Sequence, residues 1–144
     1  MPPDVELVDK YLAKVELFNG LSREDVLKIF AKGMTMRCAK DEVIFYKDTV
    51  GSQMYVVLGG KVGVFDGDLC MATLGAGDMF GEMALVNKEP RSATVRALEE
   101  SRLFVLSEST FEHLLTKRAA IRILLNIIHT LSRRLKQSNV RLHG

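Results

Sequence analysis

Between Thr35 and Leu106 the chain is a series of short apolar runs separated by Gly, Asp and Asn, and this pattern limits the fold more than any other feature. The runs are VIFY, MYVVL, KVGVF, CMATL, ATVRA and RLFVL. Short runs rich in β-branched and aromatic residues, with turn residues between them, predict strands. Gly59-Gly60 and Asp66-Gly67 predict two-residue hairpin turns, because glycine adopts the positive φ angles that such turns need. We therefore expect an antiparallel barrel or jelly roll.

Helical patterns flank the predicted strands. Apolar residues recur every three or four positions from Val5 to about Lys32, and NGLS at 19–22 interrupts them, which predicts two short helices. Ser22 is predicted to cap the second helix, since its hydroxyl can accept a free backbone amide. The segment from Ser109 to about Leu142 contains no Pro or Gly and its apolar spacing predicts helix to the end.

The predicted fold class is α+β, an antiparallel β jelly-roll barrel flanked by short N-terminal helices and a long C-terminal helix. We expect a single domain over 1–144, with a helical lead-in at 5–32, a β-roll at 34–107 and C-terminal helices at 109–142. A chain of 144 residues is long enough to bury a core without disulfides or metals.

Composition excludes several classes of protein. The formal net charge is only +2, which is far from the basic excess of a general nucleic-acid binder. Cys38 and Cys70 are too few for a disulfide scaffold and are expected to be reduced, buried thiols, which suits a cytoplasmic protein. No signal peptide and no apolar stretch long enough to span a membrane is found. No metal site is expected, because His113, His129 and His143 do not lie beside a cluster of Asp, Glu or Cys.

The segment FGEMALVNKEPRSATVRA at 80–97 carries the chemistry. Gly81 permits a ligand to approach the backbone closely. Glu82 accepts hydrogen bonds and suits a ligand hydroxyl, whereas the Arg91 guanidinium matches two phosphate oxygens at once. The small residues Ser92 and Ala93 leave their amides accessible. The segment would therefore suit a ligand that has a hydroxyl on one side and one phosphate on the other. The alternative is a Glu82–Arg91 salt bridge that simply holds a loop.

These residues resemble the phosphate-binding cassette of the cyclic nucleotide-binding domain family, which reads Phe-Gly-Glu-x-Ala-Leu and then Pro-Arg-small-Ala-Thr. Here the cassette is Phe80 to Leu85 followed by Pro90 to Thr94, and the resemblance extends over about nine-tenths of the chain. It implies that Glu82 binds the ribose hydroxyl and Arg91 binds the cyclic phosphate. The implied ligand-binding residues in this segment are Phe80, Gly81, Glu82, Met83, Ala84, Arg91, Ser92 and Ala93. One departure is Asp41, where the family commonly has glycine.

The implied ligand is cyclic AMP or cyclic GMP, with no metal. Cyclic AMP is favoured, because a threonine directly after the cassette arginine often accompanies cyclic GMP preference and this chain has Ser92. The resemblance implies a regulatory or sensor module and no enzyme, since Glu82 is assigned to the sugar and no water-activating base is evident. The alternatives are a phosphodiesterase-type or metal-dependent enzyme on the same barrel, and a jelly-roll interaction domain without a ligand.

The last helix is expected to transmit ligand binding. Its sequence SRRLKQSNVRL resembles the dimer helix of regulators of the catabolite activator type. Seam spacing predicts a homodimer through Ile121, Leu124, Ile128, Leu131 and Leu135. Ser138 and Asn139 are then candidates to bind the purine edge. The alternative is a monomer whose helix packs this stripe on its own barrel. No DNA-reading helix follows before Gly144. The sequence leaves open a stand-alone sensor, the regulatory domain of a cyclic nucleotide-gated channel, and the sensor fragment of a transcription regulator.

Overall fold

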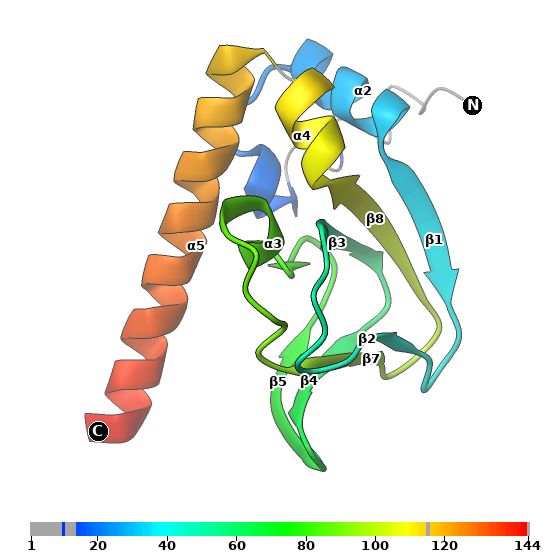
Figure 1. Ribbon diagram of the computed structural model, residues 1–144, viewed down its shortest axis with the longest axis vertical. Helices are drawn as coiled ribbons and strands as arrows, with labels where there is room; N and C mark the ends of the chain where they lie inside the picture. Colours follow the sequence, from blue (N-terminus) through cyan, green and yellow to red (C-terminus); the bar gives the residue numbers. More distant parts are fainter. Residues whose placement is uncertain (1–9, 11–13, 115, 144) are drawn as a thin grey trace.

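The protein is a β-roll with helices at one end and one long helix along its side (Figure 1). The computed structural model describes residues 10, 14–114 and 116–143, and among these the side chains of residues 86, 113, 114 and 138–143 are not described. In chain order the elements are the short 3₁₀ helix η1 (Glu16–Phe18), α2 (Arg23–Lys32), β1 (Met34–Cys38), β2 (Val43–Phe45), β3 (Gln53–Gly59), β4 (Val62–Asp66), β5 (Leu69–Leu74), β6 (Met79–Phe80), α3 (Met83–Val86), β7 (Thr94–Ala97), β8 (Ser101–Ser107), α4 (Glu108–Leu114) and α5 (Lys117–His143).

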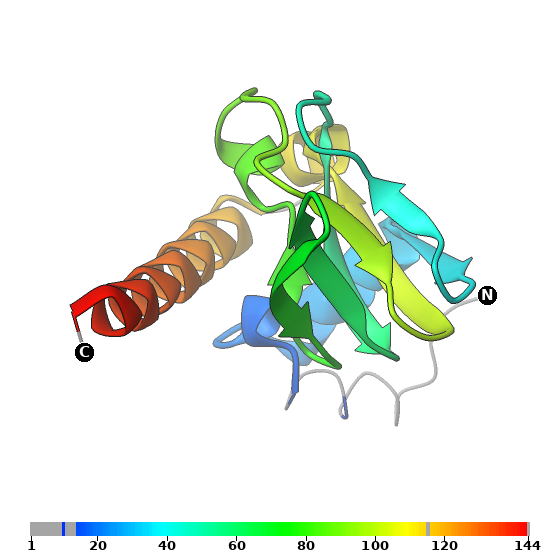
Figure 2. The ribbon, with the colours of Figure 1, turned by 90° about the horizontal axis from the view of Figure 1, so that it is seen from below.

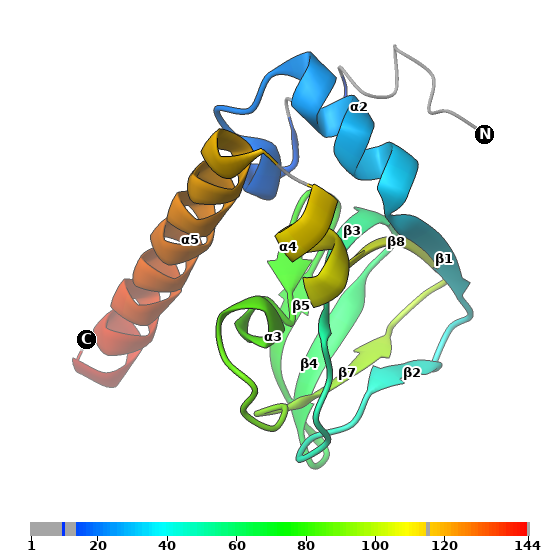
Figure 3. The same cartoon turned by 45° about the horizontal axis from the view of Figure 1, so that its top comes forward.

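The strands form two four-stranded antiparallel sheets, in the orders β1-β8-β3-β6 and β2-β7-β4-β5. The predicted fold class is therefore confirmed. The predicted cap is present as well, because the Ser22 hydroxyl accepts a hydrogen bond from the Asp25 amide at 3.1 Å. Figure 3 shows α2, α4 and the start of α5 gathered at one end of the roll.

The central strands β3 and β8 of the first sheet are buried on both faces, and this explains why they are continuous apolar runs. In β3, Tyr55 and Val57 point into the roll, whereas Met54 and Val56 contact the helical layer. Strand β8 alternates in the same way. Continuous apolar runs are typical of strands covered on both sides. The helical side of this core contains residues from η1, α2, α4 and α5, among them Phe18, Ile29, Phe111, Ile123 and Ile127.

Only one of the two predicted hairpin turns exists. Asp66 pairs with Leu69 across the β4–β5 hairpin, and Gly67 has a φ of 59° in its turn. The Gly59-Gly60 prediction is wrong, because β3 pairs with β6 and β8 while β4 pairs with β5 and β7. These glycines instead carry the chain from one sheet to the other. Gly60 has a φ of 93°, and a Cβ there would lie 2.6 Å from the Glu100 carbonyl oxygen.

Two further positions refine the sequence predictions. Asp41, where the family commonly has glycine, has a φ of 71°, so this turn needs a residue that tolerates the left-handed region. The prediction that both cysteines are buried is wrong for Cys70, which is exposed because β5 is an edge strand. Cys38 is buried inside the roll.

Helix α5 contacts the rest of the molecule along one face. Ala119, Ile123 and Ile127 are buried against the helical core, and Leu124 and Leu131 are partly buried beside them. A second apolar stripe is exposed and consists of Ile121, Leu125, Ile128 and Leu135. In Figure 2 the helix lies to one side of the two sheets. The predicted seam is thus divided between two faces, since Leu124 and Leu131 face the protein's own core.

Candidate ligand-binding site

The predicted cassette lies at the mouth of the roll, where β6 ends and α3 begins. Gly81 links the two elements with a φ of 73°, and a Cβ at this position would lie 2.8 Å from Nη1 of Arg91. The left-handed backbone and the close approach of Arg91 both favour glycine here. The chain then turns through α3 and returns as β7, which brings Glu82 and Arg91 to the same cavity.

Arg91 is a buried cation that is held by neutral groups. Its side chain donates from Nη1 to the Gly81 carbonyl at 3.1 Å and from Nη2 to the Gln53 carbonyl at 2.7 Å. The guanidinium carbon lies 4.1 Å from the centre of the Phe45 ring. Only 8% of the residue is exposed, and Nε has no hydrogen-bond partner among the described residues. Burial lowers the pKa of Arg91, and interactions with Tyr55 and Glu82 oppose that shift.

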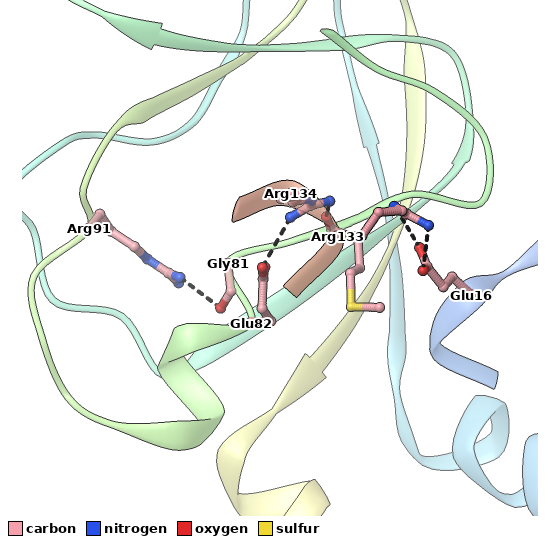
Figure 4. Close-up of polar contacts among 7 residues, drawn as sticks. Glu16, Gly81, Glu82, Arg91, Arg133 and Arg134 are labelled. Carbon is pink, nitrogen blue, oxygen red and sulfur yellow. Dashed lines mark hydrogen bonds and ion pairs between the residues drawn. The ribbon is translucent and has the colours of Figure 1, made fainter. Parts of the chain in front are cut away.

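Glu82 forms its ion pair with the long helix and not with Arg91. Its Oε1 lies 3.0 Å from Nη1 of Arg134, although Glu82 is only 5% exposed (Figure 4). Nη2 of Arg134 donates to the Met79 carbonyl at 2.7 Å. The alternative of a Glu82–Arg91 salt bridge is therefore not what the structure contains. Because a carboxylate has four lone-pair sites, Glu82 can accept a ligand hydroxyl while it keeps Arg134.

The cassette surrounds a cavity of about 350 Å³, a size within the range of small-molecule sites. All eight cassette residues proposed from the sequence line it: Phe80, Gly81, Glu82, Met83, Ala84, Arg91, Ser92 and Ala93. Apolar residues of the second sheet form one wall, namely Val64, Ala72, Leu74 and Val95. Charged groups at one end and an apolar wall at the other suit a ligand with a phosphate and a flat ring.

Sequence reasoning expected the last helix to reach the ligand through Ser138 and Asn139, but it missed the two α5 residues that line this cavity. Leu131 and Arg134 both line it, and they are three positions apart, so they share one face of the helix. The sequence contained a signal for this contribution. Neighbouring positions lie on different faces of a helix, so only one of the two adjacent arginines in LSRRLK can lie on the same face as the apolar residues. The other candidates on this helix, Ser138 and Asn139, have side chains outside the described residues.

No group of three or more His, Cys, Asp or Glu side chains that could hold a metal ion occurs among the residues that the structure describes. None of the helices described is both long and apolar enough to cross a bilayer.

Comparison with known proteins identifies the family. The model of the cyclic nucleotide-binding domain matches residues 35–118, which is more than half of the chain. The chain belongs to the cyclic nucleotide-binding domain family. The match begins in β1 and ends at the start of α5, so it contains the whole β-roll and the cassette.

Three relatives illustrate the range of proteins that this chain is similar to. The chain is 31% identical to a cyclic AMP receptor protein of Thermus thermophilus over 131 residues, which are 88% of this chain and 60% of that protein. It is 38% identical to a cyclic nucleotide-gated potassium channel of Rhizobium etli over 101 residues, which are 70% of this chain and 28% of the channel. The regulatory domain of Toxoplasma gondii PKA, solved in complex with cAMP, matches with a TM-score of 0.68 and 26% identity, covering 80% of this chain and 46% of that one.

The chain spans only part of the curated relatives it matches. It covers 60%, 24% and 26% of the lengths of three of them.

Proposed function

We propose that this chain binds a cyclic nucleotide and acts as a regulatory or sensor module. The observation that carries the proposal is a buried arginine held only by neutral groups, in one cavity with a buried carboxylate. Arg91 binds the cyclic phosphate, since its planar guanidinium matches two phosphate oxygens. Glu82 accepts the ribose 2′-hydroxyl, and Gly81, Ala84, Ser92 and Ala93 line the sugar and phosphate. The relatives named as cyclic AMP receptor and gated channel support this assignment.

Cyclic AMP is the proposed preferred ligand. Ser92 stands where, in the family, a threonine often accompanies cyclic GMP preference, and a relative is known in complex with cAMP. The ligand is bound without turnover, because the two charged cassette residues are both assigned to holding it. In a competition titration we expect cyclic AMP to displace a fluorescent analogue at lower concentration than cyclic GMP does. We also expect the cyclic AMP to be recovered unchanged, and formation of 5′-AMP or stronger displacement by cyclic GMP would contradict these assignments.

Helix α5 is the proposed output of the module. Leu131 and Arg134 line the cavity, so a bound nucleotide contacts the helix directly. Arg134 also pairs with the carboxylate that is assigned to the ribose. A ligand that contacts α5 in only one of its positions shifts the helix toward that position.

The proposed homodimer forms through the exposed stripe of α5. The exposed apolar residues of the stripe are Ile121, Leu125, Ile128 and Leu135. Together with the exposed Ser132, which lies between Ile128 and Leu135, they follow one another at steps of four, three, four and three positions. This is the spacing of a two-helix seam. The stripe replaces the seam predicted from the sequence, in which Leu124 and Leu131 took part. Leu131 is packed against the protein's own core, so a substitution at Leu131 would not test the dimer.

Ile128→Glu is the variant that tests the dimer. Ile128 is 60% exposed, so a charge there should cost the isolated chain little stability but should place two carboxylates together in a seam. We expect a folded monomer by light scattering, whereas the parent is a dimer. His129→Glu is the matched control, because His129 is exposed on the same turn but lies outside the stripe. A monomeric parent chain would contradict the proposed dimer.

We propose that the whole chain acts as one module with its helical lead-in, β-roll and C-terminal helices. Its wider setting is a regulator of the receptor type or a gated channel, as in the two relatives. A cytoplasmic location stays a prediction from the sequence.

A further inference from the structure

Asn126 is a buried polar residue on the face of α5 that packs against the protein. Only 8% of it is exposed. Its Nδ2 donates to the carbonyl oxygens of Leu17 and Asn19, each at 2.8 Å. Both protons of the amide are therefore bonded to the backbone of the η1 segment, which lies more than a hundred residues earlier in the chain. Two bonds from one planar group fix the position of α5 along its axis and also its rotation.

The second anchor lies two turns further along α5. Arg133 makes a bidentate ion pair with Glu16, with distances of 2.7 and 3.0 Å (Figure 4). Such paired N–H···O bonds add geometric specificity to the electrostatic attraction. Both anchors attach α5 to η1, and neither Asn126 nor Arg133 lines the ligand cavity.

Arg134 reaches the ligand cavity from this anchored helix. Asn126 and Arg134 are eight residues apart, so they lie on the same face at a separation of about 12 Å along the axis. Thr130 lies between them, fully buried, and its hydroxyl has no partner among the described residues. The polar contacts between α5 and the rest of the protein here are thus the Asn126 and Arg133 anchors on η1 and the bonds of Arg134 to Glu82 and to the Met79 carbonyl. A shift of the helix on η1 would withdraw Arg134 from Glu82.

We propose that Asn126 is a positioning residue for the nucleotide site, which acts through Arg134 without touching the ligand. By holding α5 on η1, it keeps Arg134 on one oxygen of Glu82 and leaves the rest of that carboxylate oriented toward the ligand hydroxyl. The inference rests on the proposed function, since it concerns the same site. The inference adds to the proposed function that contacts with η1 fix the position of α5 before the ligand binds.

A double-mutant cycle between Asn126→Leu and Arg134→Gln tests the inference. Leucine has a similar size but cannot donate to the two carbonyls, and the loss of one hydrogen bond changes an equilibrium constant, here that of the helix position, by about fivefold. We expect Asn126→Leu to weaken cyclic AMP binding about fivefold or more in the parent chain. In the Arg134→Gln background we expect a change of less than about twofold, because the residue through which Asn126 acts is already gone. Thr130→Val is the matched control, since it is buried on the same face without a bond to η1, and should leave affinity within about twofold.

Equal effects of Asn126→Leu in both backgrounds would overturn the inference, because Asn126 would then act through general stability. If Asn126→Leu does not fold, Glu16→Gln removes the other anchor at a partly exposed position, and the same cycle applies. Amide exchange of the ligand-free chain tests the inference without any nucleotide. Exchange at 131–137 should speed up severalfold when Asn126 is replaced in the parent, but little in the Arg134→Gln chain. A parent chain that fails to bind cyclic AMP would count against the proposed function, whereas an additive exchange cycle would count against the role of Asn126.

Discussion

Replacing Arg91 with alanine is expected to lower the affinity for cyclic AMP about 150- to 5,000-fold, equivalent to about 3 to 5 kcal/mol. The cause is that the cyclic phosphate would enter a largely apolar cavity without its positive partner. Arg91 is buried and bonded to two backbone carbonyls, so the cost of desolvating and orienting this cation is already met in the fold. Calorimetric titration of the parent and the variant measures the difference.

The stability of the Arg91→Ala variant must be measured alongside its affinity. Its two carbonyl bonds and its contact with Phe45 would be lost, so we expect a lower melting temperature as well as weaker binding. Arg96→Ala is the matched control. Arg96 lies on β7, the strand that follows Arg91 in the chain. Its guanidinium carbon lies 4.4 Å from the centre of the Phe65 ring, but Arg96 does not line the ligand cavity. An Arg91→Ala chain that is folded and binds within a fewfold of the parent would refute the role of Arg91.

The second large effect is expected for Glu82→Ala, which should weaken cyclic AMP binding about ten- to a hundredfold. The variant removes the acceptor for the ribose hydroxyl and also leaves Arg134 without its carboxylate. Because Arg134 connects this carboxylate to α5, the helix should respond less to the ligand. Amide exchange at 128–137 should slow when cyclic AMP is added to the parent, and this slowing should be much smaller in Glu82→Ala.

The 2′-deoxy nucleotide separates the two functions of Glu82. The parent should bind it about ten- to a hundredfold more weakly than cyclic AMP, because a buried carboxylate would lose its hydroxyl partner. Glu82→Ala should bind both ligands with similar affinity. Equal binding of both nucleotides by the parent would mean that Glu82 serves the helix alone.

The sequence was informative about the fold wherever the apolar pattern was strong. Runs such as MYVVL and RLFVL became β3 and β8, which are buried on both faces. Two strands were missed for physical reasons. In β1 only Cys38 is buried, so the run MTMRC carries little apolar signal, and β6 has only two residues. The error at Gly59-Gly60 arose because glycine marks a positive φ angle but does not specify which strands pair across it.

The candidate site combines residues that are close together in the sequence with residues that come from distant elements, and only the first group could be predicted. The cassette is one short segment, so its eight candidate residues could be named together, and all of them line the cavity. Phe45, Val64 and Arg134 reach the same cavity from other strands and from α5, and their places depend on tertiary packing. The division of the α5 leucines between core and surface also depends on packing. Periodicity identified an apolar helix but could not distinguish its two stripes.

The most direct test of the account is a calorimetric titration of the parent chain with cyclic AMP, with adenosine as the ligand that lacks the phosphate. We predict saturable binding of one cyclic AMP per chain and much weaker binding of adenosine, because Arg91 would then have no anion to bind. A folded parent chain that binds neither ligand, or binds adenosine as tightly as cyclic AMP, would contradict the proposed nucleotide site.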